Sequence, residues 1–145
     1  MTTTVIVADE ATARVFSSVS FRAKLNEIKL LTNDHDRELD RESLKELPIQ
    51  TLSPKRESHS QEHEESQKHH SKHIFAQKVI SYIEELYQKQ CLGHLVIVAA
   101  AEFLGELRKA TPAEIERNVI LEMPEDLTKL NTEQIYQQLQ VYYGR

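Results

Sequence analysis

The chain has 145 residues, of which 39% are hydrophobic and 28% are charged, a balance typical of one globular domain with its own core. Its three glycines are too few for a glycine-rich phosphate loop, and the single cysteine, Cys91, excludes an internal disulfide and a thiolate metal cage. The net charge of −5 gives no general support for nucleic-acid binding, which would need a local basic patch.

The first 33 residues predict three short strands. Segments 2–8 and 13–20 are rich in β-branched residues and flank the turn-like "DEAT", which indicates two antiparallel strands. In segment 25–33, Ile28 and Leu30 alternate with charged residues, a pattern typical of a strand with one buried face. The sequence therefore predicts an antiparallel β-meander.

A polar segment follows the predicted meander. From residue 34 to residue 60 the chain contains Pro48 and Pro54 and shows no sustained hydrophobic period. We expect a long loop here, with at most one short helix around "RESLKEL", and we expect residues around 34–66 to be mobile.

The second half of the chain alternates helices and strands. Segment 61–90 lacks proline and glycine and carries apolar residues at helical spacing, which predicts a long amphipathic helix. Segment 94–101, "HLVIVAAA", predicts a strand buried on both faces inside a parallel sheet. A helix over 102–110 and a strand over 117–123 are predicted next.

Two further helix starts carry capping residues. Thr111 precedes a proline and lies three residues before Glu114, the spacing of an N-cap. Asn131 or Thr132 is predicted to cap a last helix. One face of that helix is apolar and is expected in the core or at an oligomer face; it consists of Ile135, Leu139 and Tyr142.

This order of elements predicts one α/β domain over residues 1–145. Its sheet would be mixed, with a three-strand antiparallel meander plus strands that arrive by helical crossovers, and with helices packed on it. A ribonuclease-H-like arrangement has this order. The longest apolar run, 95–101, is too short to span a membrane, and the N-terminus lacks a secretory pattern, so we expect a cytoplasmic protein without membrane insertion.

Five of the seven histidines lie in segment 58–73, "SHSQEHEESQKHHSKH". On a continuous helix four of them fall within roughly 80° of one another and make weak candidates for zinc or nickel ligands; these are His59, His63, His70 and His73. The same face lies roughly 130° from the apolar stripe of the later helix, so it points to water. We therefore expect a solvated helix without a metal site, while a loosening of this segment by acid stays open.

Asp9 ends the first predicted strand. A ribonuclease-H-like nuclease would use it among several metal-binding carboxylates, but the central strand offers only Glu102 nearby. The alternative is that Asp9 caps the following turn or pairs with Arg14. Arg14, Arg108 and Lys109 could in turn form a small basic site, although the last two also suit the C-terminus of a helix.

Three blocks of residues together resemble the bacterial host-attachment family, described as a protein required for attachment to host cells. The blocks are Ala8, Asp9, Ala13, Arg14 and Phe16; Phe103, Leu104, Gly105, Leu107 and Arg108; and Asp126, Leu127 and Thr128. The resemblance covers nearly the whole chain. Ala100 and Ala101 stand where the family usually has prolines, and Glu125 stands where it usually has a lysine.

That family is similar to the ribonuclease-H-like central domain of archaeal and eukaryotic peptide-release factors and of Pelota-like proteins. The resemblance implies a non-enzymatic binding protein without a cofactor, acting through a macromolecular partner that is a protein or a ribosome or RNA. No Gly-Gly-Gln loop is present, so no hydrolytic role is carried over. A translation-related factor and a metal-dependent hydrolase are the alternatives, and a homo-oligomer is left open.

The blocks also nominate binding residues, namely Asp9, Arg14, Phe103, Gly105 and Arg108. Gly105 is informative because glycine inside a helix costs about 1 kcal/mol relative to alanine. We expect the missing side chain to permit close packing within the fold, with a groove for a partner as the alternative.

Overall fold

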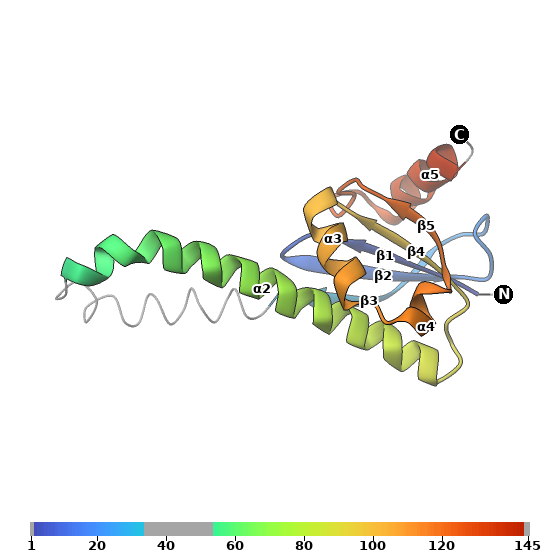
Figure 1. Cartoon of the computed structure of the whole chain (residues 1–145). Helices are drawn as coiled ribbons and strands as arrows, with labels where there is room; N and C mark the ends of the chain where they lie inside the picture. The colour runs from blue at the N-terminus through green and yellow to red at the C-terminus, as the bar shows by residue number, and fades with distance from the viewer. Residues whose placement is uncertain (1, 34–53, 144–145) are drawn as a thin grey trace.

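The computed structural model describes the backbone of residues 2–33 and 54–143, and the side chains of these residues except 54–69. Five strands in this part of the chain form one mixed sheet in the order β3-β2-β1-β4-β5, with helices on both faces (Figure 1). This confirms the predicted α/β class, and the strand order is compatible with a ribonuclease-H-like sheet. The short helix suggested around 41–47 lies outside the described residues.

The sheet is built around β1 (Thr3–Ala8), whose six residues are all buried. It pairs antiparallel with β2 (Thr12–Ser18) and parallel with β4 (His94–Ala99). At the edges, β3 (Asn26–Thr32) pairs antiparallel with β2, and β5 (Val119–Met123) pairs parallel with β4. Since β4 lies between two parallel neighbours, the prediction of a doubly buried strand is confirmed.

Alternation along the strands divides the core into two layers. Ile6 and Ile97 face α2 (Pro54–Gln88), α3 (Ala101–Ala110) and the short α4 (Ala113–Glu116). Val7 and Val98 face α5 (Thr132–Tyr143). In α2 the buried stripe has helical spacing and consists of Phe75, Ala76, Val79, Ile80 and Ile83.

The first half of α2 projects beyond the sheet (Figure 1). No residue from 54 to 70 is apolar apart from Pro54, so the sequence of this stretch offers no side chain suited to an apolar core. The helix begins at Pro54, seven residues before the predicted start, and it includes residues that were assigned to a loop. Within the described residues, no helix is long and apolar enough to cross a bilayer.

Two local predictions are wrong. Ile28 and Leu30 are 44% and 57% exposed, because β3 is an edge strand and they lie on the face opposite to Leu31, which packs in the layer beneath α2. Thr111 does not cap α4. Its hydroxyl donates to the carbonyl of Leu107 at 2.6 Å and so closes the C-terminus of α3.

The two-layer core predicts different costs for the same substitution in α3 and β3. We expect Leu107→Ala, at a fully buried side chain, to lower the free energy of unfolding by about 2–5 kcal/mol, because it removes apolar contacts and leaves a cavity. Leu30→Ala, at a side chain that is 57% exposed, should change it by no more than about 0.5 kcal/mol. Urea unfolding measures both, and equal losses would contradict this description of the core.

Candidate functional site

A crevice opens where β1 and β4 end side by side, with Ala8 paired to Ala99. After β1 the chain turns back into β2, whereas after β4 it enters α3 and continues to β5 on the opposite side. In open α/β sheets such a reversal of direction at the carboxyl ends of parallel strands is the usual place for a ligand. The pocket has a volume of about 520 Å³ and is lined by Asp9, Glu10, Ala11, Ala100, Ala101, Glu102, Phe103 and Asp126.

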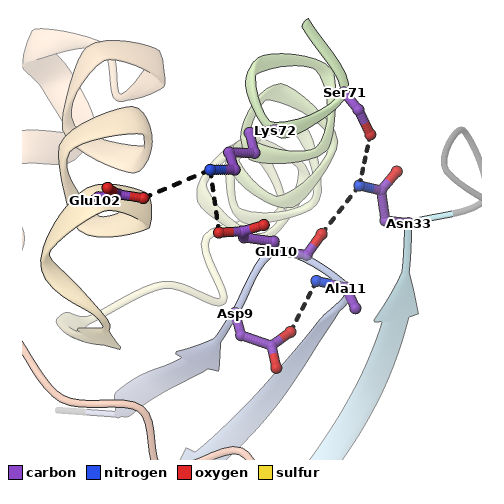
Figure 2. Close-up of polar contacts among 7 residues, drawn as sticks. All are labelled: Asp9, Glu10, Ala11, Asn33, Ser71, Lys72 and Glu102. Carbon is purple, nitrogen blue, oxygen red and sulfur yellow. Dashed lines mark hydrogen bonds and ion pairs between the residues drawn. The ribbon is translucent and has the colours of Figure 1, made fainter. Parts of the chain in front are cut away.

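Asp9 is held by hydrogen bonds within the fold. Its Oδ1 accepts from the backbone N–H groups of Ala11 at 2.8 Å and Thr12 at 2.7 Å, which caps the β1–β2 turn (Figure 2). Its Oδ2 lies 3.2 Å from the hydroxyl of Thr128. The single proton of this hydroxyl is shared with Oδ1 of Asp126, which is closer, at 2.6 Å. The turn-capping interpretation is confirmed, and Asp9 also joins β1 to the segment between β5 and α5.

Arg14 is a structural residue as well. Its Nε donates to Oε1 of Glu27 at 2.5 Å, and its Nη1 donates to the carbonyls of Thr128 at 3.2 Å and Leu130 at 2.5 Å. The guanidinium also lies 5.1 Å from the centroid of the Phe16 ring, in the range of a cation–π contact. Arg14 therefore joins β2 to the same segment that Asp9 contacts, and its ion-pair partner is Glu27 rather than Asp9.

Arg14, Arg108 and Lys109, which could have formed a small basic site, do not come together. Arg14 lies on the face of the sheet that α5 covers, whereas Arg108 belongs to α3 on the other face. Each cation of the set is paired with its own carboxylate: Arg14 with Glu27, Arg108 with Glu122, and Lys109 with Glu106. Each positive charge is neutralised by its own carboxylate, so the three cations do not form a phosphate site.

Lys72 of α2 reaches the crevice instead. Its Nζ lies 3.1 Å from Oε1 of Glu10 and 3.5 Å from Oε2 of Glu102, so it bridges the β1–β2 turn to the first turn of α3 (Figure 2). The hydrogen bond to Glu10 and the negative charge of both carboxylates raise the pKa of Lys72 against the opposing effect of its burial. The ammonium group is therefore charged across the physiological range.

A second contact lies beside this ion pair. Nδ2 of Asn33 donates to Oγ of Ser71 at 3.0 Å and to the backbone carbonyl of Glu10 at 2.9 Å (Figure 2). Both Asn33 and Ser71 are buried. The β1–β2 turn, the end of β3 and helix α2 thus meet at one point on the rim of the crevice.

Phe103 and Gly105 occupy different surroundings in α3. The Phe103 side chain is 1% exposed and stacks on Phe75 with ring centroids 5.8 Å apart, so it is a core residue. A β-carbon added at Gly105 would meet nothing within 4 Å. The expectation that Gly105 permits close packing within the fold is therefore wrong.

The histidine segment is only partly described. The side chains of His59 and His63 lie outside the described residues. His70 is exposed, and the His73 side chain, 46% exposed, lies 3.2 Å from Nε2 of Gln77 and 3.5 Å from Oε2 of Glu106. Among the described side chains no three His, Cys, Asp or Glu residues are placed to hold a metal ion together.

The sequence did not indicate that Glu10 and Lys72 belong to the site. It also did not indicate that Thr128 bonds to Asp9 and Arg14 within the fold. Lys72 is 62 positions from Glu10, and Thr128 is 119 positions from Asp9. Only the helical phase of α2 carried a signal, because Lys72 lies near the start of the buried stripe.

The contact between Asp9 and Thr128 predicts a selective loss of stability. Thr128→Val keeps the shape of the side chain but removes the hydroxyl, so we expect the free energy of unfolding to fall by about 1 kcal/mol. Thr128→Ser keeps the hydroxyl, so its free energy of unfolding should be closer to that of the wild type. Chemical denaturation of the three proteins tests this, and equal stability of the valine variant and the wild type would refute the structural role.

The ion pair of Lys72 predicts a pH dependence. Because its folded pKa is raised above the ordinary value of 10.5, its contribution is fully present below pH 10.5 and is lost as the pH rises through the folded pKa. The difference in unfolding free energy between the wild type and Lys72→Met should be no more than about 1 kcal/mol at pH 8. This difference should be smaller at pH 11 than at pH 8. A larger difference at pH 11 would contradict the ion pair.

The blocks that resemble the host-attachment family meet in this part of the structure. Asp9 and Arg14 both contact Thr128, and Phe103 lies in the core behind the crevice. The model of the family described as "Protein required for attachment to host cells" matches residues 4–139, from β1 into α5. No curated protein matches the sequence. The chain belongs to the family of proteins required for attachment to host cells.

Proposed function

We propose that this member of the family is a non-enzymatic binding protein, and that its partner docks on the crevice and on the adjoining outer face of α3 around Gly105. The observation that carries the proposal is the open space over Gly105. A glycine in the interior of a helix destabilises it by about 1 kcal/mol relative to alanine, and packing within the fold does not require one here. A partner that approaches the helix backbone closely would require it.

The state of Asp9 favours binding over hydrolysis. A metal-dependent nuclease needs a carboxylate whose oxygens are available to the ion. Here both oxygens of Asp9 accept hydrogen bonds from the protein, and those bonds hold the turn and the segment before α5. A metal ion at Asp9 would compete with these contacts for the same two oxygens.

The charges of the crevice favour a protein partner over RNA. Its lining includes four carboxylates, those of Asp9, Glu10, Glu102 and Asp126. A phosphate backbone would be repelled by this rim, whereas lysine or arginine side chains of a protein would be attracted. The relation to release factors, and with it a role on the ribosome, gains no support from these contacts.

Substitution of Gly105 separates a role in binding from a role in folding. We expect Gly105→Ala to raise the melting temperature, because the helix gains about 1 kcal/mol and the added β-carbon meets open space. Gly105→Leu should also fold normally, but it should reduce recovery of the partner roughly tenfold, a loss of about 1.4 kcal/mol of binding free energy. The measurements are thermal unfolding and quantitative affinity recovery from native lysate, with the partner identified by mass spectrometry.

Ala113→Leu is the matched control, because it adds the same side chain at an exposed position of α4. It should leave recovery unchanged. Unchanged recovery by Gly105→Leu would refute the docking surface. Recovery of ribosomal proteins that is lost after nuclease treatment would replace the protein partner with an RNA-containing one.

A further inference from the structure

The crevice and the long helix share one set of charges. Lys72 is held by Glu10 and Glu102, and both of these residues also line the crevice. The Lys72 side chain is 19% exposed, whereas those of Glu10 and Glu102 are 54% and 84% exposed. The two carboxylates therefore remain accessible to a group that enters the crevice, while the ammonium group is confined beneath them.

Lys72 also occupies a particular place along α2. The described side chains C-terminal to it form the buried stripe, beginning at Phe75. On its N-terminal side the helix projects away from the sheet (Figure 1). Ser71, next to Lys72, is bonded to Asn33, which is bonded to the carbonyl of Glu10. Contacts at these two neighbouring positions of α2 thus fasten the start of its packed half to the β1–β2 turn.

We infer that Lys72 couples the crevice to α2, so that a cationic group of the partner that binds Glu10 and Glu102 displaces Lys72 and loosens the first packed turns of the helix. This inference rests on the proposed docking of a protein partner at the crevice. A second cation beside the same two carboxylates draws on their negative charge and repels the ammonium group of Lys72, so binding at the crevice weakens the anchor of α2. By thermodynamic linkage, loosening of α2 in turn favours binding.

The coupling has a modest size. The carboxylates are largely exposed, and an ion pair of this kind contributes little in water. Asn33 and Ser71 stay in contact when Lys72 is displaced, so α2 loosens locally and does not detach. We therefore expect backbone amides of residues 70–78 to exchange with solvent about two- to fivefold faster when the ion pair is lost.

Hydrogen exchange followed by mass spectrometry tests the anchor on the isolated protein. Lys72→Met and Glu10→Gln should each accelerate exchange over residues 70–78. In the double variant, exchange should be only slightly faster than in the faster single variant, because both changes break the same contact. Lys89→Met, beyond the end of α2, and Glu114→Gln, on α4, remove the same charges elsewhere and should have no effect there. Unchanged exchange in Lys72→Met, or fully additive effects, would overturn the inference.

A chemical probe tests the coupling from the crevice. Cys91 is the single cysteine, so a Cys91→Ser, Ala101→Cys variant presents one thiol, at an exposed position of the crevice lining. A methanethiosulfonate reagent that carries a trimethylammonium group places a cation there, and methyl methanethiosulfonate is its neutral control. The cationic adduct should accelerate exchange over residues 70–78, and the neutral adduct should not. Equal effects of the two adducts, or no effect of either, would refute the coupling.

These measurements do not use the partner, so they are independent of the test at Gly105. Suppose that the cationic adduct accelerates exchange as expected, but Gly105→Leu recovers as much partner as the wild type. The partner would then bind elsewhere, and the ion pair of Lys72 would only stabilise the fold. If Gly105→Leu loses the partner but neither adduct changes exchange, the docking surface would be supported and its link to α2 would be refuted.

Discussion

The contact of Asp9 and Arg14 with Thr128 ties the segment between β5 and α5 to the β-meander. One side chain comes from the end of β1 and the other from β2, and they bind the hydroxyl and the carbonyl of the same residue. Beyond this segment, α5 itself is tied to the β2–β3 connection, because the Tyr136 hydroxyl donates to the carbonyl of Arg22 and Nε2 of Gln140 donates to the carbonyl of Phe21. Together these contacts position α5 over Val7, Val98 and Phe16, and the Thr128 contacts also place Asp126 at the wall of the crevice.

This arrangement explains why the blocks of the family resemblance are separated in the sequence but adjacent in space. Asp9, Arg14 and Thr128 satisfy one another, and Phe103 fills the core against Phe75. Such residues define the architecture, because each one lost would leave a polar partner unsatisfied or a cavity. They are poor markers of a binding function. Gly105 differs from them, since neither packing nor a backbone conformation accounts for it.

Much of the fold could be predicted because hydrophobic periodicity reports burial along a single element. The strands β1 and β4 and the stripe on α2 follow directly from it. The error at Ile28 and Leu30 arises because an alternating pattern does not reveal which face of the outer strand of a sheet a helix covers. The surroundings of Gly105 were equally inaccessible, since a helical phase alone does not say how close a neighbouring segment comes. The ion pair of Lys72 depends on the topology, which brings α2 beside the β1–β2 turn.

The position of Lys72 influences the direction of the polar, projecting half of α2. A helix that carries no apolar side chain from residue 55 to residue 73 cannot hold its direction through burial, so its direction depends on where the packed half begins. That starting point is held by the neutral contact of Ser71 with Asn33 and by the ionic bridge of Lys72 to Glu10 and Glu102. The neutral contact is buried and the ionic one borders the crevice, which makes the ionic contact the one that solvent, salt or a partner can reach. A change in charge at the crevice would therefore act first on the ionic contact of Lys72, at the point where the packed half of α2 begins.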